Sequence, residues 1–229
     1  MHRIEDRLTE VSKRITNAAH EYGRRPGEVT LLAVSKRQTA EKIAAAVSLG
    51  LKDFGENYLQ EALEKQTELK NLNICWHFIG PIQSNKTRAI ANHFDWVHTV
   101  DRIKIAERLH AQREREEPMQ VCIQVNIDNE ESKSGVLPEE AFELARAISG
   151  LPKLQLRGLM VIPEVKTDFG QQRLAFQKTR ELLVKINAKL GLSLDTLSMG
   201  MSADLEAAIA EGATIVRIGT AIFGERPTS

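Results

Sequence analysis

The chain has 229 residues, and its 31 Lys and Arg balance 31 Asp and Glu, which gives a formal net charge of zero. This balance argues against a protein held to nucleic acid or to an anionic membrane by bulk charge, because such partners favour a basic face. No apolar run approaches the roughly 20 residues of a membrane span, and the charged start MHRIEDRL is unlike a signal peptide. Cys75 and Cys122 each stand in an apolar run without a CxxC pair, so we expect buried thiols in a reducing compartment, with no disulfide and no metal site. The composition therefore predicts a cytoplasmic protein that binds neither nucleic acid nor membrane.

The first predicted element is an amphipathic helix over roughly the first 22 residues, where Ile4, Leu8, Val11 and Ile15 recur at helical spacing. Eight β-branched or aromatic runs then alternate with stretches of helical period. Strands this apolar are covered on both faces, which is typical of parallel sheets. In chain order, the predicted strands are 30–35, 53–55, 74–79, 96–100, 119–127, 156–162, 196–199 and 214–223, and the predicted helices between them are 40–49, 57–69, 101–117, 138–149, 169–190 and 203–211.

This alternation, without a Pro-, Gly- or Ser-rich linker, predicts one domain over residues 1–229, built as a single TIM (β/α)8 barrel of the α/β class. We expect residues 1–28 to form the N-terminal helix and its lead-in, and residues 29–224 to form the barrel. A doubly wound open sheet is the alternative. The extra N-terminal helix either closes the bottom of the barrel or fills a gap in the ring of helices. The motifs of P-loop NTPases, HExxH metalloproteases and α/β-hydrolases are missing from the sequence.

In TIM barrels the functional side chains lie at the carboxyl ends of the strands, so those ends carry the candidate residues. Lys36 follows the apolar run LLAVS. A lysine that is partly desolvated there loses its proton easily and can form a Schiff base with a carbonyl compound, whereas the alternative is an ordinary solvated lysine. Arg217 stands between two apolar β-branched residues of the last strand, on the same face as Ile215 and Gly219. Its guanidinium needs an acceptor, which is either an interior carboxylate or a ligand atom.

Two small polar turns follow the apolar parts of the last two predicted strands. Ser202, in the segment SMGMS, is a candidate helix N-cap, and Gly219 and Thr220 form the second turn. Each turn by itself is equally an ordinary cap or turn. Because TIM barrels frequently bind a phosphate between the loops after strands seven and eight, the two turns together predict a phosphate site. A ligand with both a phosphate and a carbonyl group within reach of Lys36 satisfies both observations.

Three further segments carry candidate side chains with ordinary alternatives. Glu56 and Asn57 end the second predicted strand, where Glu56 either faces the rim of the barrel or caps the next helix. His77 lies in an apolar run that leads into a polar loop at 80–86, and a hydrogen-bonded core histidine is the more common outcome there. The charged loop at 128–135 is either a lid or an ordinary solvated loop.

The motifs AVSK, FGENYLQE, WHFIGPIQSNK, GLMVIP, LSMGMS and VRIGTAIFG, in this order between about Thr30 and Gly224, resemble the family of pyridoxal 5′-phosphate (PLP) homeostasis proteins, the YggS/PROSC family. The resemblance implies a TIM barrel like the N-terminal domain of alanine racemase (PLP fold type III). It also implies that PLP binds as a Schiff base to the lysine ending the first strand, here Lys36. The other roles that it implies are phosphate binding by Ser202, Gly219 and Thr220, contact of Arg217 with the pyridine nitrogen, a lining of the ring by Asn57, Met199 and Ile218, and candidate wall positions for His77 and Met160.

An arginine at the pyridine nitrogen has a chemical consequence. It donates a hydrogen bond but does not hand over its proton, so the cofactor ring withdraws electrons poorly. Racemases of this fold add a tyrosine base from a second domain, whereas the two tyrosines of this sequence, Tyr22 and Tyr58, lie in or just inside predicted helices. We therefore expect a non-enzymatic, monomeric PLP carrier in vitamin B6 and amino-acid homeostasis, with PLP-dependent apoenzymes as candidate recipients. The alternatives are a low-activity PLP-dependent amino-acid racemase and a cofactor-free Schiff-base aldolase that uses Lys36.

Overall fold

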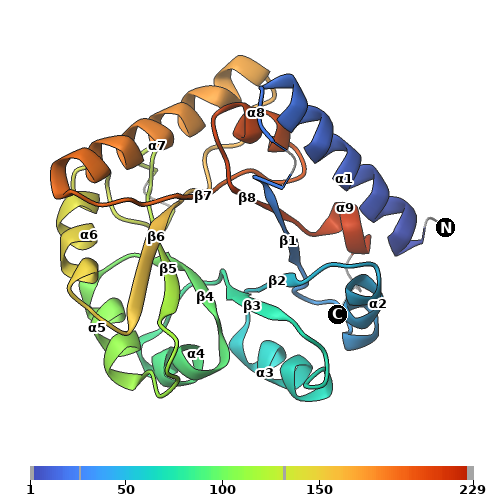
Figure 1. The fold of residues 1–229 in the computed structure, drawn as a ribbon, viewed down its shortest axis with the longest axis horizontal. Helices are drawn as coiled ribbons and strands as arrows, with labels where there is room; N and C mark the ends of the chain where they lie inside the picture. The colour runs from blue at the N-terminus through green and yellow to red at the C-terminus, as the bar shows by residue number, and fades with distance from the viewer. Residues whose placement is uncertain (1–2, 26, 131–132, 226–229) are drawn as a thin grey trace.

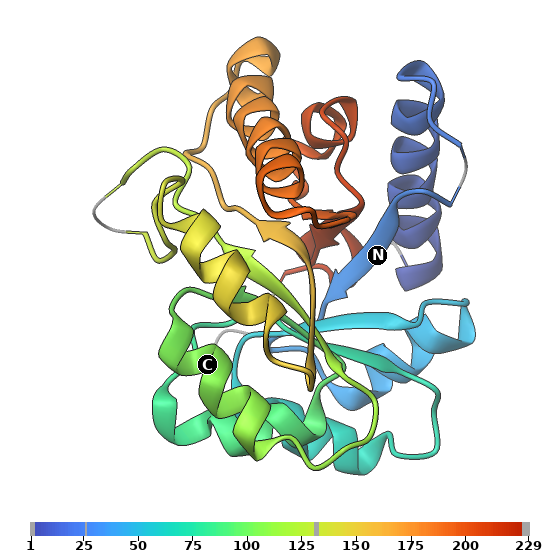
Figure 2. The same ribbon diagram turned by 60° about the vertical axis from the view of Figure 1, so that its left-hand side comes forward.

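The protein, as a computed structural model, is described over residues 3–25, 27–130 and 133–225. Within these ranges eight parallel strands close into one barrel in chain order, and helices surround them (Figures 1 and 2). The pairing of β1 with β8 closes the barrel. The prediction of a TIM barrel is thus confirmed, and the open-sheet alternative is wrong. The prediction that residues 1–229 form one domain includes positions outside the described ranges and stays a prediction.

The strands are β1 (Thr30–Val34), β2 (Asp53–Glu56), β3 (Cys75–Phe78), β4 (Trp96–Val100), β5 (Met119–Gln124), β6 (Leu154–Met160), β7 (Thr196–Ser198) and β8 (Ile215–Ile218). The helices are α1 (Ile4–Glu21), α2 (Ala40–Ser48), α3 (Leu59–Glu68), α4 (Thr87–His93), α5 (Ile103–Gln112), α6 (Ala141–Ser149), α7 (Phe169–Leu190), α8 (Leu205–Ala210) and α9 (Thr220–Phe223), with a 3-10 turn at Ser84–Lys86.

Two segments differ from the sequence prediction. The expected polar loop at 80–86 contains the 3-10 turn and leads into α4, a short helix whose buried residues Thr87, Ile90 and Ala91 are too few to give a clear helical pattern. The expected eighth strand at 214–223 ends early, because at Gly219 the chain turns into α9. The backbone N–H groups of Ile222 and Phe223 both donate to the Gly219 carbonyl oxygen. Apolar residues in such a short helix read equally well as a strand.

Helix α1 fills a gap in the helix ring, which decides between the two placements considered for it. Its buried face, with Leu8, Val11 and Ile15, packs against α8, α9 and α2 (Figure 1). The gap exists because α9, the helix after β8, has only four residues. The extra helix therefore supplies the apolar cover that α9 is too short to give.

The registers of the strands bring four strand ends together. Ala33 of β1 pairs with Ile218 of β8, and Ser198 of β7 pairs with Ile215 of β8, while β2 lies on the other side of β1. The carboxyl ends of β7, β8, β1 and β2 are thus consecutive around one rim of the barrel. In the parts of the chain that the structure describes, none of the helices is long and apolar enough to cross a bilayer.

Candidate functional site

The residues predicted from the sequence gather on that rim. Lys36 follows β1, Asn57 follows β2, Ser202 lies in the loop after β7, and Gly219 and Thr220 follow β8. Met160, a candidate wall residue, ends β6 and is fully buried. The rim therefore unites side chains that are up to 184 positions apart, counted from Lys36 to Thr220.

The backbone on both sides of Lys36 is fixed by contacts with β2 and α3. Before it, the Ser35 N–H donates to the Gly55 carbonyl oxygen at 3.0 Å. After it, Arg37 adopts a left-handed conformation with φ of 59°, and its N–H donates to Glu61 Oε1 at 2.5 Å. A non-glycine residue in this region costs of order 1–3 kcal/mol and persists only where its surroundings enforce it. Lys36 itself is half-buried, and its side chain begins from a backbone segment that is held in place on both sides at the mouth of the barrel.

A buried ion pair lies behind this turn. Lys65 Nζ donates to Glu56 Oε1 at 2.7 Å and to the Ser35 carbonyl oxygen at 2.8 Å, and Ser35 Oγ donates to the same Glu56 oxygen at 2.7 Å. Glu56 is fully buried, and burial raises the pKa of its carboxyl although Lys65 and Ser35 oppose the shift. Both alternatives for Glu56 are therefore wrong: it neither faces the rim nor caps α3, because it points outward from the barrel wall to the helix.

Arg217 is almost fully buried, and backbone carbonyls receive most of its hydrogen bonds. Nη1 donates to the carbonyl oxygen of Ser198 at 2.6 Å and to its Oγ at 2.9 Å, and Nη2 donates to the Val161 carbonyl oxygen at 2.9 Å. Burial lowers the pKa of the guanidinium to about 10, with Asp204 acting in the opposite direction, so the side chain stays protonated at neutral pH. The predicted need for an acceptor is met differently than expected, since no carboxylate in the described ranges forms an ion pair with Arg217.

The two small turns come close to the strand ends because glycines open them. A Cβ added to Gly219 would lie 3.1 Å from the Val34 carbonyl oxygen, so only glycine lets the turn after β8 approach the end of β1 without displacement. Gly200 has a φ of +96°, and a Cβ there would lie 2.6 Å from the side chain of Ala208. Both turns thus present backbone rather than bulky side chains to the rim, which suits an anion held by N–H groups.

Ser202 is placed by α1 and does not cap α8. Its carbonyl oxygen accepts from Arg14 Nη2 at 3.0 Å, and Arg14 also forms a two-point ion pair with Glu206. The N-cap of α8 is Asp204, whose Oδ1 accepts from the Met201 N–H at 2.6 Å. The N-cap prediction for Ser202 is therefore wrong, although Ser202 remains half-buried in the turn beside α8.

The residues predicted to surround a ring differ in exposure. Met199 and Ile218 are fully buried and belong to the main apolar core. Asn57 is half-buried, and its Oδ1 is a buried acceptor without a hydrogen-bond partner among the described residues. It lines a cavity of about 260 Å³ over the ends of β2 to β6, together with Thr99, Gln124 and Lys133. A buried amide oxygen without a partner beside a cavity indicates a place for a polar ligand.

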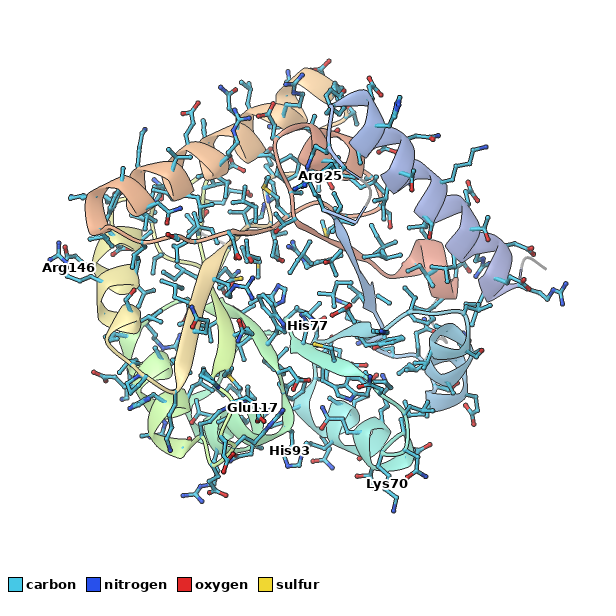
Figure 3. All side chains as sticks on the ribbon, viewed as in Figure 1. Arg25, Lys70, His77, His93, Glu117 and Arg146 are labelled. Carbon is cyan, nitrogen blue, oxygen red and sulfur yellow. The ribbon has the colours of Figure 1, made fainter. Side chains whose placement is uncertain are left out.

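Sequence reasoning missed a line of hydrogen bonds through the barrel, which we call the interior chain. It starts at Ser198, which accepts from Arg217, and Ser198 Oγ lies 2.7 Å from His98 Nδ1. His98 Nε2 is 2.9 Å from His77 Nδ1. His77 Nε2 is 3.0 Å from Asp53 Oδ1, where the chain ends. Burial lowers the pKa of His98 well below its usual value, so its ring is neutral. Figure 3 labels His77 on the inner side of the strands. The expectation that His77 is a hydrogen-bonded core residue is confirmed, and the alternating pattern of β4 could have found His98.

Comparisons with known proteins agree with this geometry. Residues 11–227 match the family model of the alanine racemase N-terminal domain. The pyridoxal phosphate homeostasis protein of Pseudomonas aeruginosa is 58% identical over 99% of this chain and 97% of its own length, and that of Escherichia coli K12 is 50% identical over 100% and 99%.

Solved structures extend the likeness. PipY of Synechococcus elongatus with PLP bound has a TM-score of 0.85 and 36% identity, over 97% of this chain and 100% of its own. Alanine racemase from Corynebacterium glutamicum shares the fold alone, with a TM-score of 0.68 and 19% identity, and this chain covers 61% of its length. The chain therefore belongs to the family of pyridoxal phosphate homeostasis proteins, within the wider family of the alanine racemase N-terminal domain.

Proposed function

We propose that the protein binds PLP at the rim formed by β7, β8, β1 and β2 and serves in the homeostasis of this cofactor. The observation that carries the proposal is the meeting of one lysine, fixed at the end of β1, with two glycine-opened turns after β7 and β8. A lysine beside an anion site matches a ligand that has both an aldehyde and a phosphate. The relative PipY, whose solved structure holds PLP, supports the same conclusion.

The donor set of the rim fits such a ligand. Lys36 would supply the amine that condenses with the aldehyde carbon, with release of water. Ser202, Gly219 and Thr220 supply hydroxyl and backbone N–H donors for the phosphate, and Thr220 is exposed while Ser202 is half-buried. Asn57, Met199 and Ile218 are assigned to the surroundings of the ring, where the unpartnered Oδ1 of Asn57 is an acceptor in need of a donor. The lysine, the donors of the two turns and the residues around the ring thus match the aldehyde, the phosphate and the ring of one molecule.

Arg217 decides which chemistry the site favours. When bound, PLP stabilises a carbanion on an attached amino acid to the degree that its pyridine nitrogen is protonated. Arg217 stays charged and donates hydrogen bonds, and two backbone carbonyls together with Ser198 hold it in place. The family resemblance implies that Arg217 contacts the pyridine nitrogen of PLP. A guanidinium there cannot deliver its proton to the nitrogen. We therefore infer that the protein carries or buffers PLP and does not act as an efficient enzyme.

The two tyrosines lie in different surroundings. Tyr58 is exposed just after β2, with the Arg37 guanidinium 5.8 Å from the centre of its ring. Tyr22 lies at the end of α1 with Arg173 at 5.9 Å, and burial raises the pKa of its hydroxyl, which keeps it protonated at neutral pH. Burial of the Tyr22 hydroxyl therefore favours the carrier over the racemase.

The remaining parts of the proposal concern the protein's surroundings. We propose a cytoplasmic, monomeric protein whose recipients are PLP-dependent apoenzymes, to which a cofactor at an open rim can be passed. The loop at 128–135, considered above as a lid, includes residues 131–132, which lie outside the described residues, and it receives no role in this proposal.

The visible absorption spectrum of the protein, purified without added cofactor, tests the proposal. A yellow wild type, a colourless Lys36→Ala variant and a yellow Lys86→Ala variant would be the expected result, because Lys86 is an exposed lysine after β3 and serves as the matched control. A wild type that stays colourless after addition of PLP would refute cofactor binding and leave the cofactor-free aldolase. Interconversion of L- and D-alanine that is lost in Lys36→Ala would replace the carrier by the racemase.

A further inference from the structure

Three potential metal ligands meet at the opposite mouth of the barrel, where the strands begin. Asp53 starts β2, Cys75 starts β3, and His77 follows two positions later on the same face of β3. Their donor atoms all lie within 4.8 Å of one another. Cys75 Sγ is 3.4 Å from His77 Nε2, which in turn is 3.0 Å from Asp53 Oδ1. Oxygen, sulfur and nitrogen donors from two neighbouring strands thus surround one point.

The separations of these atoms are close to those of a tetrahedral zinc site. With metal–ligand distances of about 2.3 Å for sulfur and 2.0–2.1 Å for nitrogen and oxygen, tetrahedral angles place sulfur and nitrogen about 3.6 Å apart and nitrogen and oxygen about 3.3 Å apart. The observed 3.4 Å and 3.0 Å are shorter by only a few tenths of an ångström. Binding of the cation therefore requires these two separations to widen by only a few tenths of an ångström.

The interior chain holds His77 in the orientation that a ligand requires. Metal-binding histidines use one ring nitrogen for the metal and donate from the other to a partner behind it. Here Nδ1 of His77 faces His98 Nε2 at 2.9 Å, and a neutral His98 can accept this bond while donating from Nδ1 to Ser198. Trp96 stacks on the His77 ring at a centroid distance of 5.5 Å and an interplanar angle of 8°. Nε2 is thereby aimed at the mouth.

The mouth is open to solvent and its donor set selects the kind of cation. The side chain of Asp53 is 30% exposed and Cys75 is half-buried, so a cation can enter and water can serve as a fourth ligand. Thiolate, imidazole and carboxylate together suit Zn²⁺ and its chemical relatives, whereas Mg²⁺ and Ca²⁺ prefer oxygen alone. Asp95 also lies nearby, since it accepts from the N–H of Trp76, and its own charge is balanced by Arg115 at 2.8 Å.

We propose that Asp53, Cys75 and His77 form a binding site for one divalent cation of borderline softness, with Zn²⁺ as the best match. On binding, Cys75 Sγ forms a bond to the metal and releases its thiol proton to solvent. The proposal revises the sequence prediction, which treated Cys75 as a buried thiol without a metal role. It concerns the end of the barrel remote from Lys36, so it does not depend on PLP binding.

Titration of the tag-free, reduced protein with Co²⁺, a spectroscopic substitute for Zn²⁺, tests this site. The wild type should take up one equivalent, develop a thiolate-to-cobalt charge-transfer band in the near ultraviolet, and lose that band when Zn²⁺ is added. Cys75→Ser should abolish the band, and Asp53→Asn should weaken binding at least about tenfold, since even changes behind a ligand cost that much. Cys122→Ser is the matched control, because Cys122 is fully buried in β5 and should leave the titration unchanged.

Each possible result of the titration either supports or overturns the proposed metal site. A wild type without the band, or a band that survives in Cys75→Ser, overturns the proposal, and so does equal loss in Cys75→Ser and Cys122→Ser. Far-ultraviolet circular dichroism identifies any variant that fails to fold, and in that case Cys75→Ala and Asp53→Ser provide the same comparison. Lys36→Ala should bind Co²⁺ like the wild type, so a failure of the PLP proposal leaves this one standing.

Discussion

The ion pair of Lys65 with Glu56 gives the sharpest test of the structural reasoning. Lys65→Met keeps the length of the side chain and removes three hydrogen bonds, to Glu56, Glu61 and the Ser35 carbonyl oxygen. Glu56 is fully buried, so its carboxylate loses its counter-charge without gaining water. Breaking such a pair from one side costs about 3–5 kcal/mol of unfolding free energy. For a chain of this size, that corresponds to a melting temperature lower by roughly 6–20 °C.

The cost should depend on pH in a defined direction. Burial already raises the pKa of Glu56 above the ordinary 4.5, and removal of the ammonium raises it further. Between the ordinary pKa and the raised one, the folded protein then holds a proton that the unfolded chain has lost, so stability falls as pH rises through this window. At about pH 5 protonation of Glu56 limits the penalty of Lys65→Met, whereas at about pH 8 the penalty is near its full size.

Urea denaturation followed by circular dichroism at several pH values measures these differences. Adding Glu56→Gln to Lys65→Met should recover about 1–3 kcal/mol at pH 8, because a neutral amide replaces the stranded charge. Lys185→Met, on the exposed side of α7, is the control and should stay within about 0.5 kcal/mol of the wild type. A Lys65→Met variant as stable as the wild type at pH 8, or a penalty that is the same at every pH, would refute the reasoning.

Three further predictions concern the rim. Ser202→Ala and Thr220→Ala should each weaken PLP retention by about 1–3 kcal/mol, as for the loss of a hydrogen bond to a charged group, and equal affinity in equilibrium dialysis of both variants would place the phosphate elsewhere. Arg217→Glu should allow protonation of the pyridine nitrogen and shift the visible spectrum of the bound cofactor; an untouched spectrum would make Arg217 a purely structural residue. Gly200→Ala should destabilise the fold by more than Gly191→Ala in thermal melts, because both have positive φ but only a Cβ at Gly200 would collide with α8, and equal melting temperatures would contradict this.

Much of the fold could be predicted because local signals and the overall architecture agree. The predicted helix 169–190 coincides with α7, and in the structure Asp168 caps its start and Gly191, with a φ of 64°, ends it. The strand β4 was equally clear from its β-branched and aromatic run. The errors fall in two places. In α4 the few apolar residues were too few to distinguish a short helix from a loop, and after β8 a single glycine, Gly219, ends the strand and starts α9.

For the candidate site, the sequence predicts which residues lie at the ends of strands but not which partners their side chains contact. Position at the end of a strand can be read from the sequence for Lys36, which follows β1 as expected. Gly219 and Thr220 also follow the apolar part of β8, although the run 214–223 was predicted as strand and instead turns into α9. The partners of a side chain cannot be read in this way, because closure of the barrel chooses them. Arg217 donates to Val161, 56 positions earlier, and His98 contacts Ser198, 100 positions later. No local pattern contains such pairs.

The way α1 completes the helix ring affects how the protein can fold during its synthesis. The helix leaves the ribosome long before α8 and α9, two of the helices that cover its apolar face. Strand β1 likewise waits for β8 to close the barrel. Until α8 and α9 have emerged, Leu8, Val11 and Ile15 lack these partners, and exposed apolar surface of this kind favours aggregation and chaperone binding. Folding to the closed barrel therefore has to wait until β8, α8 and α9 have emerged, and a nascent chain stalled before α8 should remain protease-sensitive throughout α1.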